Sequence, residues 1–175
     1  MRTRKKKRIP TSVEVASRAR VSQRSVFERF GNLDALGLAA FDYILEHRPS
    51  TPADDVRKAD RQTRVRFQVG VCARSCEIWL PVWRLVVCAY GASQALEERV
   101  ERMRALARGR LEHMYRPEFD SLSEPARNAV LIALEALTDW ACWVRMREHY
   151  GHSFDQACNA WIEAIERLLP PTPAS

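Results

Sequence analysis

Hydrophobic residues recur along most of this chain at the i, i+3, i+4 spacing of amphipathic helices. The repeat is cleanest where the apolar positions are Val130, Leu134, Leu137, Ala141 and Val144. Only six glycines interrupt the chain, and the residue types that favour helices, such as alanine, leucine, arginine and glutamate, are abundant. The pattern therefore predicts an all-α fold.

Capping signals near the N-terminus predict two short helices joined by a tight turn. Thr11 and Glu14 fit a capping box, in which a hydroxyl and a carboxylate three residues apart satisfy the free backbone amides of a helix start. The helix that they open runs to about Ala19, and Ser22 caps the next one, whose apolar face is Val26, Phe27 and Phe30. This is the layout of a helix-turn-helix, whose second helix enters a DNA major groove.

A further helix and a loop then close the first domain. Gly31-Asn32 ends the second helix, and Asn32 or Asp34 starts a third that runs to about His47. Pro49-Ser50-Thr51-Pro52 marks the best internal boundary. We therefore expect a helix-turn-helix domain over residues 1–47, with a basic arm at 1–10, and a second helical domain over residues 48–175.

The second domain is expected to contain several long helices. One is predicted from about Asp54 to Glu77, after which Pro81 kinks or restarts the chain. Another covers Leu96 to His113. The last two helices are predicted over residues 125–150, beginning at Ser123-Glu124-Pro125, and over residues 153–169, beginning at Ser153.

Charge is distributed unevenly between the two ends of the chain. The net formal charge is +6, but residues 1–30 carry ten Lys/Arg against two Glu, so the other 145 residues sum to −2. A basic N-terminal end favours an anionic partner there. Five cysteines without a CxxC pair suit a reduced compartment, no apolar run is long enough to span a bilayer, and the start lacks a secretion signal, so we expect a cytoplasmic protein without a membrane partner.

Sequence signatures of enzymes are missing from the chain. It has no Gly-rich phosphate loop, no nucleophile elbow and no HExxH metal motif. His149 and His152 flank Gly151, but two histidines without a further ligand are weak evidence for a metal, and helix-end capping explains them better. We therefore expect neither an enzyme nor a cofactor or metal.

The N-terminal residues resemble those of TetR-family transcriptional regulators. The resemblance lies in Val15-Ala16, Ala19-Arg20-Val21-Ser22, Ser25-Val26-Phe27 and Phe30-Gly31, with Leu36 leading into the following helix. It covers about residues 11–45. The rest of the chain is similar to the family only in its number of helices and in its closing helix pair. The resemblance implies a regulator of transcription that binds double-stranded DNA.

The resemblance also assigns candidate DNA-binding residues. It implies that Gln23, Arg24 and Ser25 face base edges, where Gln pairs with adenine and Arg with guanine. Thr11 and Ser22 sit at helix N-termini, where hydroxyls and backbone amides suit phosphates. The other candidate DNA-binding residues are Ser12, Phe27 and Arg29.

Four departures from the family pattern bear on this assignment. The family has a full helix before the helix-turn-helix, whereas ten mostly basic residues precede Thr11 here, so we expect either a functional start upstream or an incomplete DNA-binding head. Arg20 replaces the turn glycine, at a cost of about 1 kcal/mol if it is left-handed. Phe27 replaces a phosphate-binding Tyr, and Leu33 a Lys. The lost phosphate contacts would be compensated electrostatically by Arg20, Arg24, Arg29 and the basic arm.

The second domain carries two further expectations from the resemblance. Its helices would enclose a pocket for a small apolar effector, and its last two helices, 125–150 and 153–169, would form a homodimer interface. For both, ordinary monomer core is the alternative. The candidate ligand-binding residues are Trp79, Trp83, Val87, Tyr90, Met103 and Trp140. Cys72 and Cys76 share a helical face and suit either a thiol sensor or, as favoured, buried packing.

The sequence thus predicts a dimeric, ligand-responsive transcription factor, most simply a repressor that binds a palindromic operator. The alternative is a protein of the same fold that binds ligands or partners and has lost specific DNA binding.

Overall fold

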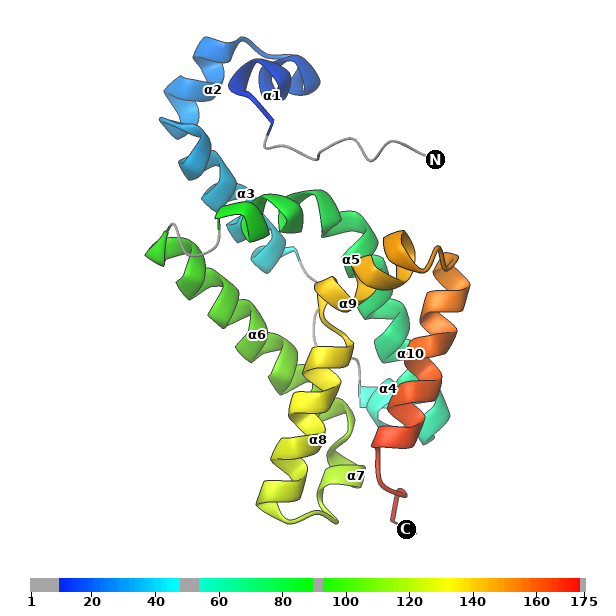
Figure 1. Cartoon of the computed structure of the whole chain (residues 1–175). Coiled ribbons are helices and arrows are strands. Elements are labelled where there is room, and N and C mark those ends of the chain that lie inside the picture. The colour runs from blue at the N-terminus through cyan, green and yellow to red at the C-terminus, as the bar shows by residue number, and fades with distance from the viewer. Residues whose placement is uncertain (1–9, 48–53, 90–92, 174–175) are drawn as a thin grey trace. The chain divides into compact units, whose positions relative to one another are not determined.

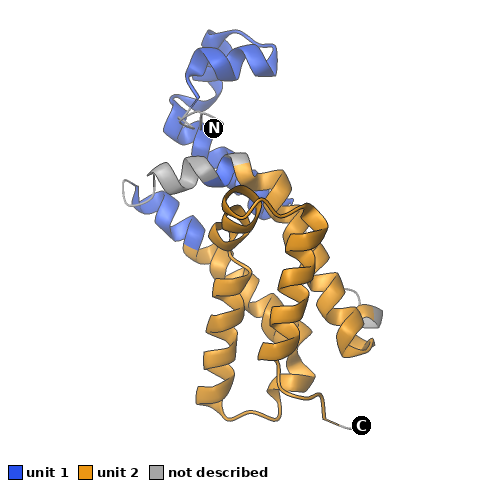
Figure 2. Ribbon diagram, turned by 45° about the vertical axis from the view of Figure 1, so that its right-hand side comes forward, with its two compact units in different colours: residues 1–47, 81–100 blue, residues 48–80, 101–175 orange. Residues whose placement is uncertain are grey.

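The computed structural model describes residues 10–47, 54–89 and 93–173 (Figure 1). All regular elements within these ranges are helices, so the predicted all-α fold is confirmed. The chain divides into two compact units, one of residues 1–47 and 81–100, the other of residues 48–80 and 101–175 (Figure 2). Residues 81–100, which the sequence places in the second domain, belong to the first unit.

The first unit begins with three short helices, each started by the cap that the sequence predicts. They are α1 (Ser12–Ala19), α2 (Gln23–Phe30) and α3 (Leu33–Glu46). The N-caps are Thr11, Ser22 and Asn32, whose side chains each accept a hydrogen bond from a backbone N–H three residues on. Gly31 ends α2 with a φ of 77°, a left-handed value that glycine adopts without strain.

A small core and one ion pair hold the first unit together. Its buried apolar residues are Ala16, Val26, Phe41, Ile44, Trp83, Leu96 and Val100. Arg99 donates from Nε and Nη2 to the two carboxylate oxygens of Asp42, at 2.7 and 2.9 Å. These bonds raise the pKa of the Arg99 guanidinium. The bidentate pair therefore ties α3 to the first turns of α6 (Gln94–Met114).

The second unit surrounds a larger apolar core. Besides parts of α5 (Arg61–Ala89) and α6, it contains α4 (Asp54–Lys58), α7 (Arg116–Phe119), α8 (Glu124–Leu137), α9 (Trp140–Val144), the π-helical turn η1 (Arg145–His149) and α10 (Phe154–Leu168). Trp143 and Trp161 lie at its centre with ring centroids 4.8 Å apart, and neither is exposed. Tyr115 is buried in the same core, and burial raises the pKa of its hydroxyl.

Two of the predicted long helices are wrong in their boundaries. The helix predicted from Asp54 to Glu77 is interrupted, because the Asp60 carboxylate accepts hydrogen bonds from the Thr63 N–H and hydroxyl and so starts α5. Helix α5 also stays helical across Pro81 and ends at Ala89. A proline removes one backbone hydrogen bond from a helix interior, and the turns of α5 on both sides of Pro81 remain helical.

The helix predicted over residues 125–150 is likewise divided. Helix α8 ends at Leu137, and the Asp139 carboxylate accepts a 2.7 Å hydrogen bond from the Ala141 N–H to cap α9. The Thr138 hydroxyl donates to the Leu134 carbonyl at 2.8 Å, a local bond that competes with helix continuation. The apolar repeat continues through the break, which is why periodicity alone predicts one helix.

Burial also shows which residues of the apolar stripes along α8 and α10 belong to the monomer core. Leu134, Trp161 and Ile165 are fully buried in the core of the second unit, so these stripe residues are monomer core and are not free to form a dimer surface. Leu168 of the α10 stripe stays 37% exposed, and Ile132 of α8 is 53% exposed.

Candidate nucleic-acid interface

The N-terminal segment forms two capped helices joined by a turn at Arg20. Thr11 closes the predicted capping box, accepting from the Glu14 N–H at 3.3 Å while its own N–H donates to Glu14 Oε2 at 2.8 Å. The Ser22 hydroxyl accepts from the Ser25 N–H at 3.0 Å. Both starts follow from short-range chemistry, which is why the sequence predicts them well.

Arg20 adopts the left-handed conformation that the turn requires. Its φ and ψ are 56° and 40°, and it is the one non-glycine residue with positive φ among the described residues. The Val21 N–H donates back to the Ala16 carbonyl at 3.0 Å, as in helix ends that turn through a left-handed residue. The chain therefore makes the tight turn without glycine, at the cost expected for a side chain in this conformation.

The outer face of α2 is polar and exposed. Val26 points inward and is 5% exposed, whereas Gln23, Arg24, Ser25 and Arg29 are all exposed. Phe27 lies on the same outer side with 39% of its surface exposed. The structure thus places the base-reading residues that the resemblance implies together on one accessible helix, within the first unit.

Several predicted phosphate contacts are already engaged within the protein. The Thr11 hydroxyl donates to Glu14 Oε2 at 3.0 Å, so its proton is used by the capping box. The Ser12 hydroxyl accepts from Gln23 Nε2 at 2.7 Å, and the Ser22 and Ser25 hydroxyls bond each other at 2.8 Å. A phosphate at Thr11 would therefore have to displace Glu14, whereas the Ser12 hydroxyl keeps its own proton to donate.

Positive charge around the two helices comes from exposed arginines. Arg18, Arg20, Arg24 and Arg29 are exposed, against the carboxylates of Glu14 and Glu28. Nine of the ten residues of the basic arm, residues 1–9, lie outside the described part of the chain. The described residues of α1 and α2 alone therefore carry a modest positive excess.

The candidate ligand-binding residues fall in both units. Trp83 is buried in the first unit, whereas Trp79, Met103 and Trp140 are half-buried in the second. Tyr90 and the side chain of Val87 lie outside the described residues. The effector pocket therefore stays a prediction. Cys76 is buried, which raises the pKa of its thiol, and Cys72 accepts from Gln68 Nε2 at 3.3 Å.

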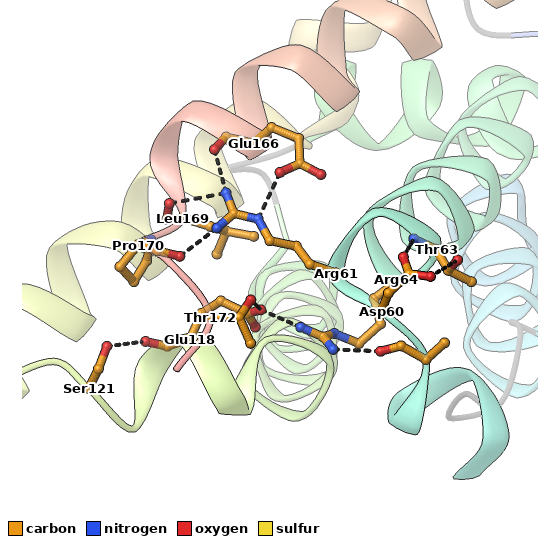
Figure 3. A network of polar contacts seen from close by, with 11 residues as sticks. Asp60, Arg61, Thr63, Arg64, Glu118, Ser121, Glu166, Leu169, Pro170 and Thr172 are labelled. Carbon is orange, nitrogen blue, oxygen red and sulfur yellow. Dashed lines mark hydrogen bonds and ion pairs between the residues drawn. The ribbon is translucent and has the colours of Figure 1, made fainter. Parts of the chain in front are cut away.

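The second unit also holds a buried polar network that sequence reasoning missed (Figure 3). The Arg64 guanidinium pairs with Glu118, and both side chains are nearly inaccessible. The Thr172 hydroxyl donates to the same Glu118 oxygen at 2.5 Å. Arg61 donates to the carbonyls of Glu166, Leu169 and Pro170 at the end of α10. This network fixes the C-terminal residues onto α5 and α7.

No family model, curated protein or solved structure matches this chain. None of the described helices combines the length and apolarity that a membrane crossing requires.

Proposed function

We propose that this protein is a DNA-binding transcriptional regulator of the TetR type, whose α1 and α2 form a helix-turn-helix. In this proposal α2 enters the major groove, and Gln23, Arg24 and Ser25 meet base edges. The regulator is a repressor released by a small apolar effector. The observation that carries the proposal is the exposed polar face of α2, presented by two capped helices with a left-handed turn between them.

Electrostatics supports DNA as the partner. The exposed Arg20 and Arg29 side chains flank the outer face of α2, and the arm adds six further Lys/Arg before Thr11. Neutralisation of phosphates by such residues releases counterions and supplies the sequence-independent part of the affinity. Binding should therefore weaken steeply as salt increases.

A dimer would use the solvent-facing sides of α8 and α10. Ile132 and Leu168 are large apolar residues left exposed there, with the small side chains of Ala136 and Ala160 exposed on the same helices. Two-fold pairing of these faces would present two copies of α2 to half-sites about one DNA turn apart, roughly 34–36 Å. The operator would then be palindromic.

Release by an effector would follow from a population shift. The protein would have one conformation that fits the operator and one in which the two DNA-binding heads are misaligned. An apolar effector that binds the misaligned conformation more tightly lowers the affinity for the operator, by as much as the effector's own affinities for the two conformations differ. The side chains proposed to meet it are those of Trp79, Trp83, Met103 and Trp140, with Val87 and Tyr90.

One observation favours a second candidate function, a ligand- or partner-binding protein without specific DNA binding. The Thr11 hydroxyl is held by Glu14, and a second carboxylate, Glu28, stands on the outer face of α2. Negative charge beside a DNA backbone opposes binding. This candidate predicts weak affinity that does not depend on DNA sequence.

The test compares two exposed arginines that each pair with a carboxylate four residues further along the chain. Arg24 is 86% exposed and pairs with Glu28, and Arg116 is 71% exposed and pairs with Asp120. We expect Arg24→Ala to abolish the preference for a DNA duplex enriched by the wild-type protein from a randomised pool, because one bidentate contact to guanine is worth about 1–3 kcal/mol.

Arg116→Ala removes the same charge from α7 and should leave that preference intact. Equal losses in both variants would mean that bulk charge alone binds DNA. An absence of any enriched sequence would favour the second candidate function.

A further inference from the structure

Two side-chain contacts on α2 hold the residues that are proposed to read bases. Arg24 Nε donates to Glu28 Oε1 at 2.7 Å, and Gln23 Nε2 donates to the Ser12 hydroxyl at 2.7 Å. The first contact lies within α2, and the second joins α2 to the start of α1. Each contact occupies one hydrogen-bonding group of Arg24 or Gln23 and leaves the others available to a base.

The contact with Glu28 occupies the Nε side of the Arg24 guanidinium. Within the described part of the chain Arg24 has no other partner, and its side chain is 86% exposed. The Nη1 and Nη2 donors are therefore free and point away from the occupied side. That pair of donors is the edge that forms two parallel hydrogen bonds with the O6 and N7 acceptors of guanine.

The contact with Ser12 similarly restricts Gln23. The contact uses one of the two Nε2 protons, so the second N–H and Oε1 both remain available. A donor and an acceptor side by side are the two groups that pair with N7 and N6 of adenine in the major groove.

The Arg24–Glu28 pair is poorly placed to stabilise the helix itself. Arg24 lies in the first turn of α2 and Glu28 lies near its end, so both charges oppose the helix dipole. The Glu163–Arg167 pair of α10 has the favourable order, with the glutamate first. Glu28 also places a negative charge on the face that would approach DNA. These costs favour a role in reading bases over a role in stability.

We propose that Glu28 and Ser12 are positioning residues that set the base specificity of α2, with guanine read by Arg24 and adenine read by Gln23. Glu28 does this at the expense of sequence-independent affinity, since its carboxylate repels phosphates. The inference rests on the proposed function, because it requires α2 to lie in a major groove.

The experiment first enriches a duplex from a randomised DNA pool with the full-length wild-type chain. The dissociation constants for this duplex and for a scrambled duplex are then measured with wild-type, Glu28→Ala, Glu28→Gln and Asp120→Ala proteins. Their ratio reports specificity, and the scrambled duplex alone reports sequence-independent affinity. The Glu28→Gln variant retains an acceptor for Arg24 Nε without the charge, and Asp120→Ala removes an equally exposed carboxylate that pairs with Arg116, outside the helices proposed to bind DNA or a second copy.

We expect Glu28→Ala to bind the scrambled duplex more tightly and to lower the specificity ratio about three- to tenfold, because Arg24 regains side-chain freedom that binding must remove again. Glu28→Gln should also bind the scrambled duplex more tightly but keep the ratio within about twofold of wild type, and Asp120→Ala should change neither quantity. In an Arg24→Ala background, Glu28→Ala should not change the ratio further. Ser12→Ala should broaden base preference beside the guanine.

Three results overturn the inference. A ratio unchanged in Glu28→Ala would show that Arg24 needs no support, and an equal loss in the Arg24→Ala background would show that Glu28 acts by another route. An enriched sequence without guanine would contradict the assigned edge. If the wild-type chain enriches no sequence, the proposed function fails as well, whereas the first three results leave it standing.

Discussion

Removing Glu118 should destabilise the second unit more than almost any other single change of a polar residue. Its carboxylate is fully buried and is paired with Arg64, whose side chain is 5% exposed. In Glu118→Leu the guanidinium keeps only the Ala59 carbonyl, at 2.8 Å, as a partner. An uncompensated buried charge costs about 3–5 kcal/mol, so the free energy of unfolding should fall by that amount.

The double variant Arg64→Met/Glu118→Leu separates the cost of an unpaired charge from the value of the pair. Arg64 Nε and Glu118 Oε2 have no hydrogen-bond partner. The attraction between the two charges therefore offsets only part of the free energy needed to remove them from water. We therefore expect the double variant to lie within about 2 kcal/mol of wild type. Thr172→Val removes one hydrogen bond to Glu118 and should cost about 1 kcal/mol.

Urea unfolding followed by tryptophan fluorescence measures these differences, because Trp143 and Trp161 lie in the core of the same unit. A loss below about 1 kcal/mol in Glu118→Leu would refute the reasoning. So would a double variant that is as unstable as the single one.

Three further predictions concern single groups. Burial raises the pKa of the Tyr115 hydroxyl above its ordinary 10.0, so the folded protein keeps this proton at a pH where the unfolded chain loses it. The stability that is present below pH 10 is therefore lost as the pH rises further. Tyr115→Phe should reduce this loss of stability in urea titrations, whereas Tyr150→Phe, at an exposed position, should not. Iodoacetamide should leave the buried Cys76 unmodified in native protein and label it in urea, and native labelling seen by peptide mass mapping would contradict its burial. Arg20→Gly should be about 1 kcal/mol more stable than Arg20→Ala, since only glycine relieves the left-handed turn, and equal melting temperatures would argue against that strain.

The sequence predicts those features that depend on neighbouring residues. The caps at Thr11, Ser22, Asn32 and Ser153 all form as expected, because each satisfies a backbone N–H three residues away. The interruption at Asp139 was not predicted, since the apolar repeat of a helix continues across it. Local chemistry and hydrophobic periodicity conflict there, and the local cap prevails.

Features that join distant parts of the chain were not predictable in this way. Arg64 and Glu118 are 54 residues apart, and each alone resembles an ordinary charge on a solvated helix face. The contact between Gln23 and Ser12 depends on how α1 meets α2, which no spacing rule gives. Periodicity also could not tell whether Leu134, Trp161 and Ile165 face the core or a second copy of the chain, and their burial decides for the core.

The exposed face of α2 was predictable because the cap at Ser22 sets the start of the helix, and the start sets which residues point outward. Its proposed role in DNA binding is the central claim. Fluorescence anisotropy tests this claim most directly, by titrating the chain onto the duplex that it enriches from a random pool and onto a scrambled duplex at several salt concentrations. The account predicts tighter binding to the enriched duplex at every concentration, with both affinities falling as salt increases. Equal affinity for the two duplexes throughout would contradict it.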